Sequence, residues 1–143
     1  MRITEILHHK GRKVHRTRTV ETVAAAARLL AGHNIGALLV QDPWGHHAGL
    51  FSERDLVRGL ARHGAAALGL PVAELMTADV ITCHPHDRID EAMRMMTAHR
   101  IRHLPVEEGG AIVGIVSIGD LVRSLLDEKE LEVGVLRDLA RAH

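Results

Sequence analysis

The feature that most constrains this sequence is an internal repeat. One block reads Gly-Leu-Phe-Ser-Glu-Arg-Asp-Leu-Val-Arg at residues 49–58, and Gly-Ile-Val-Ser-Ile-Gly-Asp-Leu-Val-Arg follows 65 residues later, at 114–123. Two further blocks precede it and recur at an offset of 66 residues, 23–30 at 89–96 and 33–40 at 99–106. Three blocks in the same order are hard to obtain by chance, so the chain contains two copies of one structural unit.

Each copy has the pattern of a β-α-β-β-α unit. A short extended segment leads into an amphipathic helix, and an apolar strand, a turn and a second strand follow. The second strand ends at Ser52 in one copy and at Ser117 in the other, where a second helix begins. The expected ranges of the first three elements are 14–16, 20–33 and 36–40 in the first copy, and 80–82, 86–99 and 103–106 in the second.

The repeat also predicts the domain organisation. The expected parts are an N-terminal segment or helix at 1–13, a first domain at 14–63, a linker at 64–79, a second domain at 80–127 and a C-terminal helix at 128–143. Gly134 is a possible break in that last helix. Because each copy alone would bury too little apolar surface, we expect an α/β (α+β) fold in which the copies pack with pseudo-two-fold symmetry.

Composition excludes several classes of protein. Eighteen Lys+Arg balance eighteen Asp+Glu, which removes the basic footprint of a general nucleic-acid binder. Trp44 and Phe51 are the only aromatic residues, so a surface that stacks bases is not expected. No apolar run is long enough to span a bilayer, and the single cysteine, Cys83, cannot form an internal disulfide. These features predict a cytoplasmic protein with no nucleic acid or membrane as partner.

The repeated pattern resembles the CBS domain, the module named after cystathionine beta-synthase. The segment HRIRHLPVEEGGAIVGIVSIGDLV at 99–122 carries the resemblance most clearly, and the pair resembles a Bateman module. The first copy is looser, since Gly36-Ala37-Leu38-Leu39 lacks the proline found as Pro105 in the second. The resemblance implies a stand-alone, non-catalytic pair that binds AMP, ADP, ATP, S-adenosylmethionine, NAD or a similar adenosine ligand in clefts between the copies.

The Ser-x-x-Asp motif at Ser52–Asp55 and Ser117–Asp120 has two interpretations. It resembles a capping box, in which serine caps a helix and an acid follows at its third position. The family resemblance instead implies that the aspartate holds ribose hydroxyls, through charge-assisted hydrogen bonds, while the serine lines the phosphate side. Free amides in the first helical turn would favour that phosphate. Both roles can coexist if the aspartate turns outward.

Other candidate ligand contacts surround this motif. Arg102 and His103 resemble basic positions that reach nucleotide phosphates in the gamma subunit of AMP-activated kinase, although a solvated Arg102 is equally consistent with the pattern. Arg54 and Arg58 are further phosphate candidates, with a solvated helix face as the default. The remaining candidates for the adenine slot and its rim are Ile35, Gly36, Thr17, Thr82, Pro105, Ile115 and Ile118, all of which also suit a core.

The twelve histidines have no metal-site spacing, and we interpret them as surface residues. Cys83 lacks a local activating pattern, so it is expected to be an ordinary thiol. We identify no catalytic set and no metal ligands in this sequence.

The sequence therefore predicts a regulatory adenosine-ligand sensor that acts in trans on an unknown protein. The alternatives are a structural or interaction module with empty clefts, and a metal-binding or redox protein that uses histidines and Cys83. Apolar positions on more than one face of the second helices, such as Val57, Leu60, Leu121 and Val122, predict a homodimer. The two clefts should differ, because Arg102-His103 aligns with Gly36-Ala37.

Overall fold

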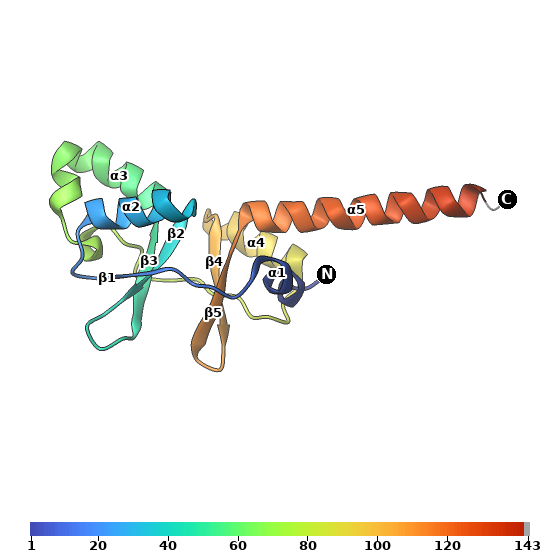
Figure 1. Cartoon of the computed structure of the whole chain (residues 1–143), viewed down its shortest axis with the longest axis horizontal. Helices are drawn as coiled ribbons and strands as arrows, with labels where there is room; N and C mark the ends of the chain where they lie inside the picture. Colours follow the sequence, from blue (N-terminus) through green and yellow to red (C-terminus); the bar gives the residue numbers. More distant parts are fainter. Residues whose placement is uncertain (142–143) are drawn as a thin grey trace. The chain divides into compact units, whose positions relative to one another are not determined.

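The computed structural model describes residues 1–141 and divides the chain into two compact units. The repeat-one unit comprises Lys13–Ile81, and the repeat-two unit comprises Met1–Arg12 together with the chain from Thr82 onward. The predicted mixed α/β fold is confirmed, since each unit combines helices with a small sheet (Figure 1). The N-terminal segment folds with the second copy, although it precedes the first copy in the sequence.

The elements of the repeat-one unit follow the predicted β-α-β-β-α order: β1 (Arg16–Arg18), α2 (Val23–His33), β2 (Ala37–Gln41), β3 (His47–Ser52) and α3 (Glu53–His63). Strand β2 lies at the centre of the sheet, parallel to β1 and antiparallel to β3. Helix α2 begins after Thr22, whose hydroxyl accepts a hydrogen bond from the Ala25 amide at 3.1 Å. It ends at Asn34 in the left-handed conformation that favours a helix stop.

The segment expected to be a linker is a folded part of the repeat-one unit. It forms two short 3-10 helices, η1 (Gly64–Gly69) and η2 (Val72–Glu74). Val72 is fully buried in the same core as Phe51 of β3, and the backbones of Leu50 and Thr77 form an isolated bridge. The glycines and proline in this stretch therefore mark turns within the unit.

The repeat-two unit contains α1 (Ile3–Lys10), α4 (Ile89–His99), β4 (His103–Glu108), β5 (Ala111–Ser117) and α5 (Ile118–Arg141). Strands β4 and β5 form an antiparallel hairpin. Its turn is made by Gly109 and Gly110, whose φ angles of 59° and 81° suit glycine.

The strand expected at 80–82 is wrong for this copy. Instead, Cys83 forms an isolated parallel bridge with Val106. The ladder stops there because Pro85 follows two residues later and has no amide hydrogen to donate. The corresponding part of the first copy lacks a proline and forms β1.

Helix α1 completes the core of the repeat-two unit. Ile3, Ile6 and Leu7 are buried, and the Ile3 amide donates to the Asp87 carbonyl at 3.0 Å. Leu7 packs so closely over β5 that a Cβ added to Gly114 would lie 2.5 Å from its Cδ2 atom. A side chain at position 114 would therefore displace the buried Leu7 side chain.

Helix α5 does not break at Gly134. It runs continuously for 24 residues, whereas the equivalent helix α3 has 11. As far as Arg141, the C-terminal helix expected at 128–143 is thus the continuation of the second helix of this copy, and the last two positions of that prediction lie outside the described residues. In Figure 1 its far half, drawn in red, extends past α1 and α4.

Candidate functional site

The first candidate site is the corner where β3 meets α3. Here Ser52 and Asp55 form a reciprocal capping box: the Asp55 amide donates to Ser52 Oγ at 3.4 Å, and the Ser52 amide donates to Asp55 Oδ2 at 2.9 Å. The hydroxyl of Thr77 donates to the other carboxylate oxygen, Oδ1, at 3.1 Å. With 6% of its surface exposed, Asp55 is a buried acid whose two oxygens both accept hydrogen bonds from the chain.

The equivalent corner of the repeat-two unit lies between β5 and α5. The Ser117 amide donates to Asp120 Oδ2 at 2.8 Å, and the Asp120 amide donates to Ser117 Oγ at 3.1 Å. Lys10, the last residue of α1, places its Nζ atom 2.6 Å from the same Oδ2 and donates to the Ile115 carbonyl at 2.8 Å. Thr77 bonds the Asp55 oxygen that the Ser52 amide does not use, whereas Lys10 shares one Asp120 oxygen with the Ser117 amide.

The electrostatics of Asp120 follow from these contacts. Burial raises the pKa of this carboxyl, but the hydrogen bonds from Lys10 and Ser117 and the charge of Lys10 outweigh burial. The pKa of Asp120 therefore lies below its ordinary value, and the group is ionised at neutral pH. Both of its side-chain contacts described above use Oδ2, and a carboxylate has about four lone-pair sites.

The capping interpretation of Ser-x-x-Asp is therefore realised in both copies, with each aspartate facing its serine. The expected free amides are also partly used. The amide of Glu53 donates to the Gly36 carbonyl at 3.0 Å, and that of Ile118 donates to the Arg102 carbonyl at 2.8 Å. These two bonds bring Gly36 and Arg102 next to the corner of their own copy. The sequence alone did not indicate which strand lies beside which Ser-x-x-Asp motif.

The other predicted ligand contacts differ in accessibility. Thr17 of β1 is 5% exposed, and its hydroxyl has no hydrogen-bond partner within the described part of the chain. A buried hydroxyl in this state is unusual, because an unmade hydrogen bond costs free energy. Pro105 is buried; half-buried positions are Ile35, Gly36, Thr82, His103, Ile115 and Ile118, and exposed ones are Arg54, Arg58 and Arg102.

Sequence reasoning missed Lys10 and Thr77. Lys10 is 110 residues from Asp120, and Thr77 is 22 residues from Asp55. Neither forms a local motif with its aspartate, so no spacing rule could have identified either residue.

The alternative chemistry of histidine and cysteine has weak structural support. Residues 1–141 contain no group of three or more His, Cys, Asp or Glu side chains placed to hold a metal ion. Burial, with the negative charge of Asp87, raises the pKa of Cys83 to about 12. Its thiol is therefore protonated at neutral pH and is a poor nucleophile.

Comparison with known proteins places this architecture in a family. A family model described as the CBS domain matches residues 72–127. The CBS domain-containing protein CBSX3 of Arabidopsis thaliana, named as mitochondrial, is 34% identical over 139 residues, covering 92% of this chain and 68% of the relative. This chain belongs to the CBS-domain family. A CBS domain-containing protein of Bacillus subtilis, YhcV, is 33% identical over 101 residues and covers 71% of each chain.

Solved CBS structures are similar over most of the chain. A CBS-domain protein from Agrobacterium tumefaciens is 42% identical with a TM-score of 0.83, covering 85% of this chain and 91% of that one. A second structure is a CBS domain pair in complex with 5′-methylthioadenosine and S-adenosyl-L-methionine. It is 26% identical with a TM-score of 0.78, covering 90% of this chain and 98% of that one. CBS domains thus account for both repeats.

Among residues 1–141, no helix is both long and apolar enough to cross a membrane. The cytoplasmic location of this CBS protein stays a prediction.

Proposed function

We propose that this CBS domain pair binds an adenosine ligand and regulates a partner protein in trans. The observation that carries the proposal is the pair of corners at Ser52–Asp55 and Ser117–Asp120, each with a carboxylate that accepts hydrogen bonds at the start of a helix. Such a carboxylate suits ribose hydroxyls, which would donate charge-assisted hydrogen bonds to it. The similar CBS pair that holds two adenosine compounds supports the same ligand class.

The two corners should contribute unequally. Asp55 is buried and accepts hydrogen bonds on both oxygens, whereas the side chain of Asp120 is 15% exposed and its contacts with Ser117 and Lys10 use one oxygen. We therefore assign the stronger ribose contact to Asp120. The unpartnered hydroxyl of Thr17 is a second polar group that a ligand could satisfy, through a ribose hydroxyl or a ring nitrogen.

The proposal includes two further expectations from the sequence. Arg102 and His103 bind the phosphate of the ligand, and the chain forms a homodimer. Val57 and Val122 are 64% and 41% exposed and leave apolar surface for a second copy, whereas Leu121 is fully buried in its own unit. Leu121 therefore belongs to the core and not to a dimer interface.

The alternative is an interaction module whose clefts stay empty. One observation favours it, because the capping boxes already give Asp55 and Asp120 a structural role. Titration calorimetry with AMP, ATP, S-adenosylmethionine, methylthioadenosine and NAD separates the two functions. A saturable isotherm with at least one of these compounds supports the sensor, and flat isotherms with all of them support the module.

A further inference from the structure

Acidic and basic side chains lie on different sides of the far part of helix α5. This helix has 24 residues against 11 in α3, so the first copy lacks its last part, from Lys129 to Arg141. At about 3.6 residues per turn, one side of the helix carries acids and apolar residues: Asp127, Glu128, Leu131, Glu132, Val135, Asp138 and Leu139. We call these seven residues the acidic face. The basic residues from position 129 onward, Lys129, Arg137 and Arg141, lie outside it.

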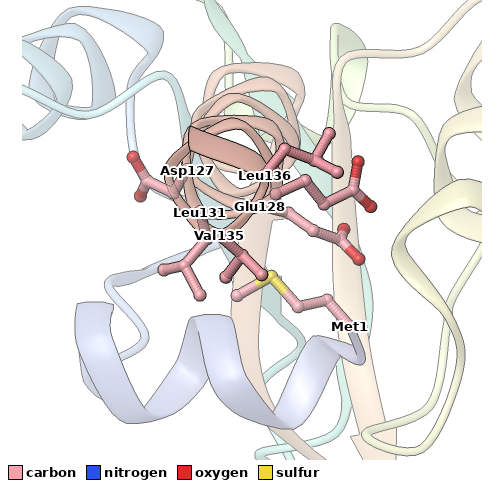
Figure 2. A pocket seen from close by; sticks show the side chains of 7 residues that line it. Met1, Asp127, Glu128, Leu131, Val135 and Leu136 are labelled. Atoms are coloured by element: carbon pink, nitrogen blue, oxygen red, sulfur yellow. The ribbon is translucent and has the colours of Figure 1, made fainter. Parts of the chain in front are cut away.

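A hollow lies beside the acidic face. It has a volume of about 650 Å³ and is bordered by α5 and by the side chain of Met1. In Figure 2, Leu131 and Val135 point from α5 toward Met1, and Asp127 and Glu128 lie on either side of these apolar side chains. Within the described part of the chain, no lysine or arginine is among the residues that line this hollow. It is therefore an apolar depression between carboxylates.

The apolar residues of the acidic face are open to solvent. Leu131, Val135 and Leu139 are 72%, 53% and 56% exposed, and exposed apolar surface of this kind marks an interaction site. The Glu132 side chain is 61% exposed and lies 3.6 Å from Lys129 Nζ, in a surface pair that solvent weakens. An occupant of this face must therefore present apolar groups with positive charge beside them.

The length of the acidic face favours a helix over a small organic cation. Asp127 and Asp138 are separated by about 16 Å along the axis of α5, and Leu131 and Leu139 by about 12 Å. A small cation spans only one turn of such a face. A helix with apolar residues at i, i+3, i+4 and i+7 and with lysine or arginine beside them matches the apolar residues and the carboxylates along the whole length.

We propose that the acidic face binds a basic amphipathic helix of another protein. The inference rests on the proposed regulation of a partner in trans, and it names the chemistry of the surface that this partner presents. The same face of a second copy is a poor occupant, because its carboxylates repel those of the first. Apolar side chains of the partner helix cover Leu131, Val135 and Leu139, and its positive charges give specificity and fast association.

Fluorescence anisotropy on the full chain tests this proposal. The probe is a labelled peptide of leucine and lysine, about 14 residues long so that it covers the acidic face, with its leucines at helical spacing. It should bind wild type saturably at low salt. Glu128→Lys and Leu131→Gln should each raise its dissociation constant at least about fivefold, because one reverses a charge and the other removes an apolar contact.

Matched controls make the same two changes outside the acidic face. Glu130→Lys and Val133→Gln should bind the peptide within about twofold of wild type, and circular dichroism checks that every variant keeps its helix content. A peptide of the same composition without helical spacing, and one with glutamate in place of lysine, should both bind at least about tenfold more weakly. Equal binding of the unpatterned peptide, or equal effects of the control and the face variants, would overturn the proposal.

Two further measurements separate the alternatives. In sedimentation equilibrium of the chain alone, Glu128→Lys should associate as wild type does, and a changed association constant would assign the acidic face to contacts between copies and overturn the proposal. Calorimetry with the adenosine compounds distinguishes this inference from the ligand proposal. Absent peptide binding with saturable ligand isotherms contradicts the partner surface alone, whereas flat ligand isotherms with intact peptide binding contradict the ligand site alone.

Discussion

Replacing Asp120 by alanine tests the ligand site most directly. The change removes the carboxylate that we assign to the ribose, together with its contacts to the Ser117 amide and to Lys10. Loss of a charged acceptor of hydrogen bonds costs about 1.5–3 kcal/mol of binding free energy. At about 1.4 kcal/mol per decade, the ligand dissociation constant should rise by one to two decades.

The same substitution also affects folding, so the two effects must be separated. The capping bond contributes about 1 kcal/mol to stability. The Lys10–Asp120 ion pair contributes less than about 1 kcal/mol, since Lys10 is 40% exposed and solvent screens it. We expect Asp120→Ala to lower the free energy of unfolding by 1–2 kcal/mol, about the sum of these two contributions.

Two matched variants distinguish binding from stability. Gly114→Ala overpacks the Leu7 side chain, and Lys10→Met removes the cation, but both keep the carboxylate and the Ser117 hydroxyl. Each should lose stability in thermal melts while binding the ligand within about threefold of wild type, a difference of less than 1 kcal/mol. If Asp120→Ala binds as tightly as these two variants in calorimetry, the ribose contact at Asp120 is refuted and its role is capping alone.

Three further predictions concern charge and packing. Since the folded-state pKa of Asp120 is depressed, its stabilising contribution is present at neutral pH and is lost as pH falls below about 4. In an acid titration, Lys10→Met should lose less stability than wild type, and equal losses of stability would contradict the ion pair. Gly114→Ala should lower the melting temperature, corresponding to about 1–3 kcal/mol of overpacking against α1, and an unchanged melting temperature would contradict the close packing of α1. Gly134→Ala, with open space around it, should instead raise helix content. Arg102→Ala should reduce the thermal shift caused by AMP more than that caused by adenosine, and equal reductions would remove Arg102 from the phosphate site.

The parts of the fold that depend on local patterns could be predicted from the sequence. Both helix starts after Ser52 and Ser117 were predicted, because a capping box lies within four residues. The strands β2 to β5 follow apolar runs between turn residues and were predicted within a few positions. Repetition strengthened each of these assignments, since the same pattern occurred twice.

The parts that depend on distant contacts could not be predicted. The pairing of Asp120 with Lys10 joins residues 110 apart, so the cation at this corner has no local signal. The continuation of α5 through Gly134 was missed because one glycine costs a helix only about 1 kcal/mol, which its neighbours can offset. The expected strand at 80–82 is reduced to one bridge at Cys83, because Pro85 follows it, and the repeat pattern carries no signal for this single residue.

The position of α1 has a consequence for the order of folding. Residues 13–81 form a contiguous unit, so the first repeat can acquire its contacts as soon as it is synthesised. Helix α1 leaves the ribosome before that repeat, yet Ile3 and Thr4 bond to carbonyls at residues 87 and 85, and Leu7 packs over Gly114. Its contacts therefore close a loop of more than 80 residues, and long-range closure of this kind is slow. A chain lacking its first twelve residues should thus fold residues 13–81 normally. It should then fail to complete the repeat-two unit, whose other residues begin at position 82.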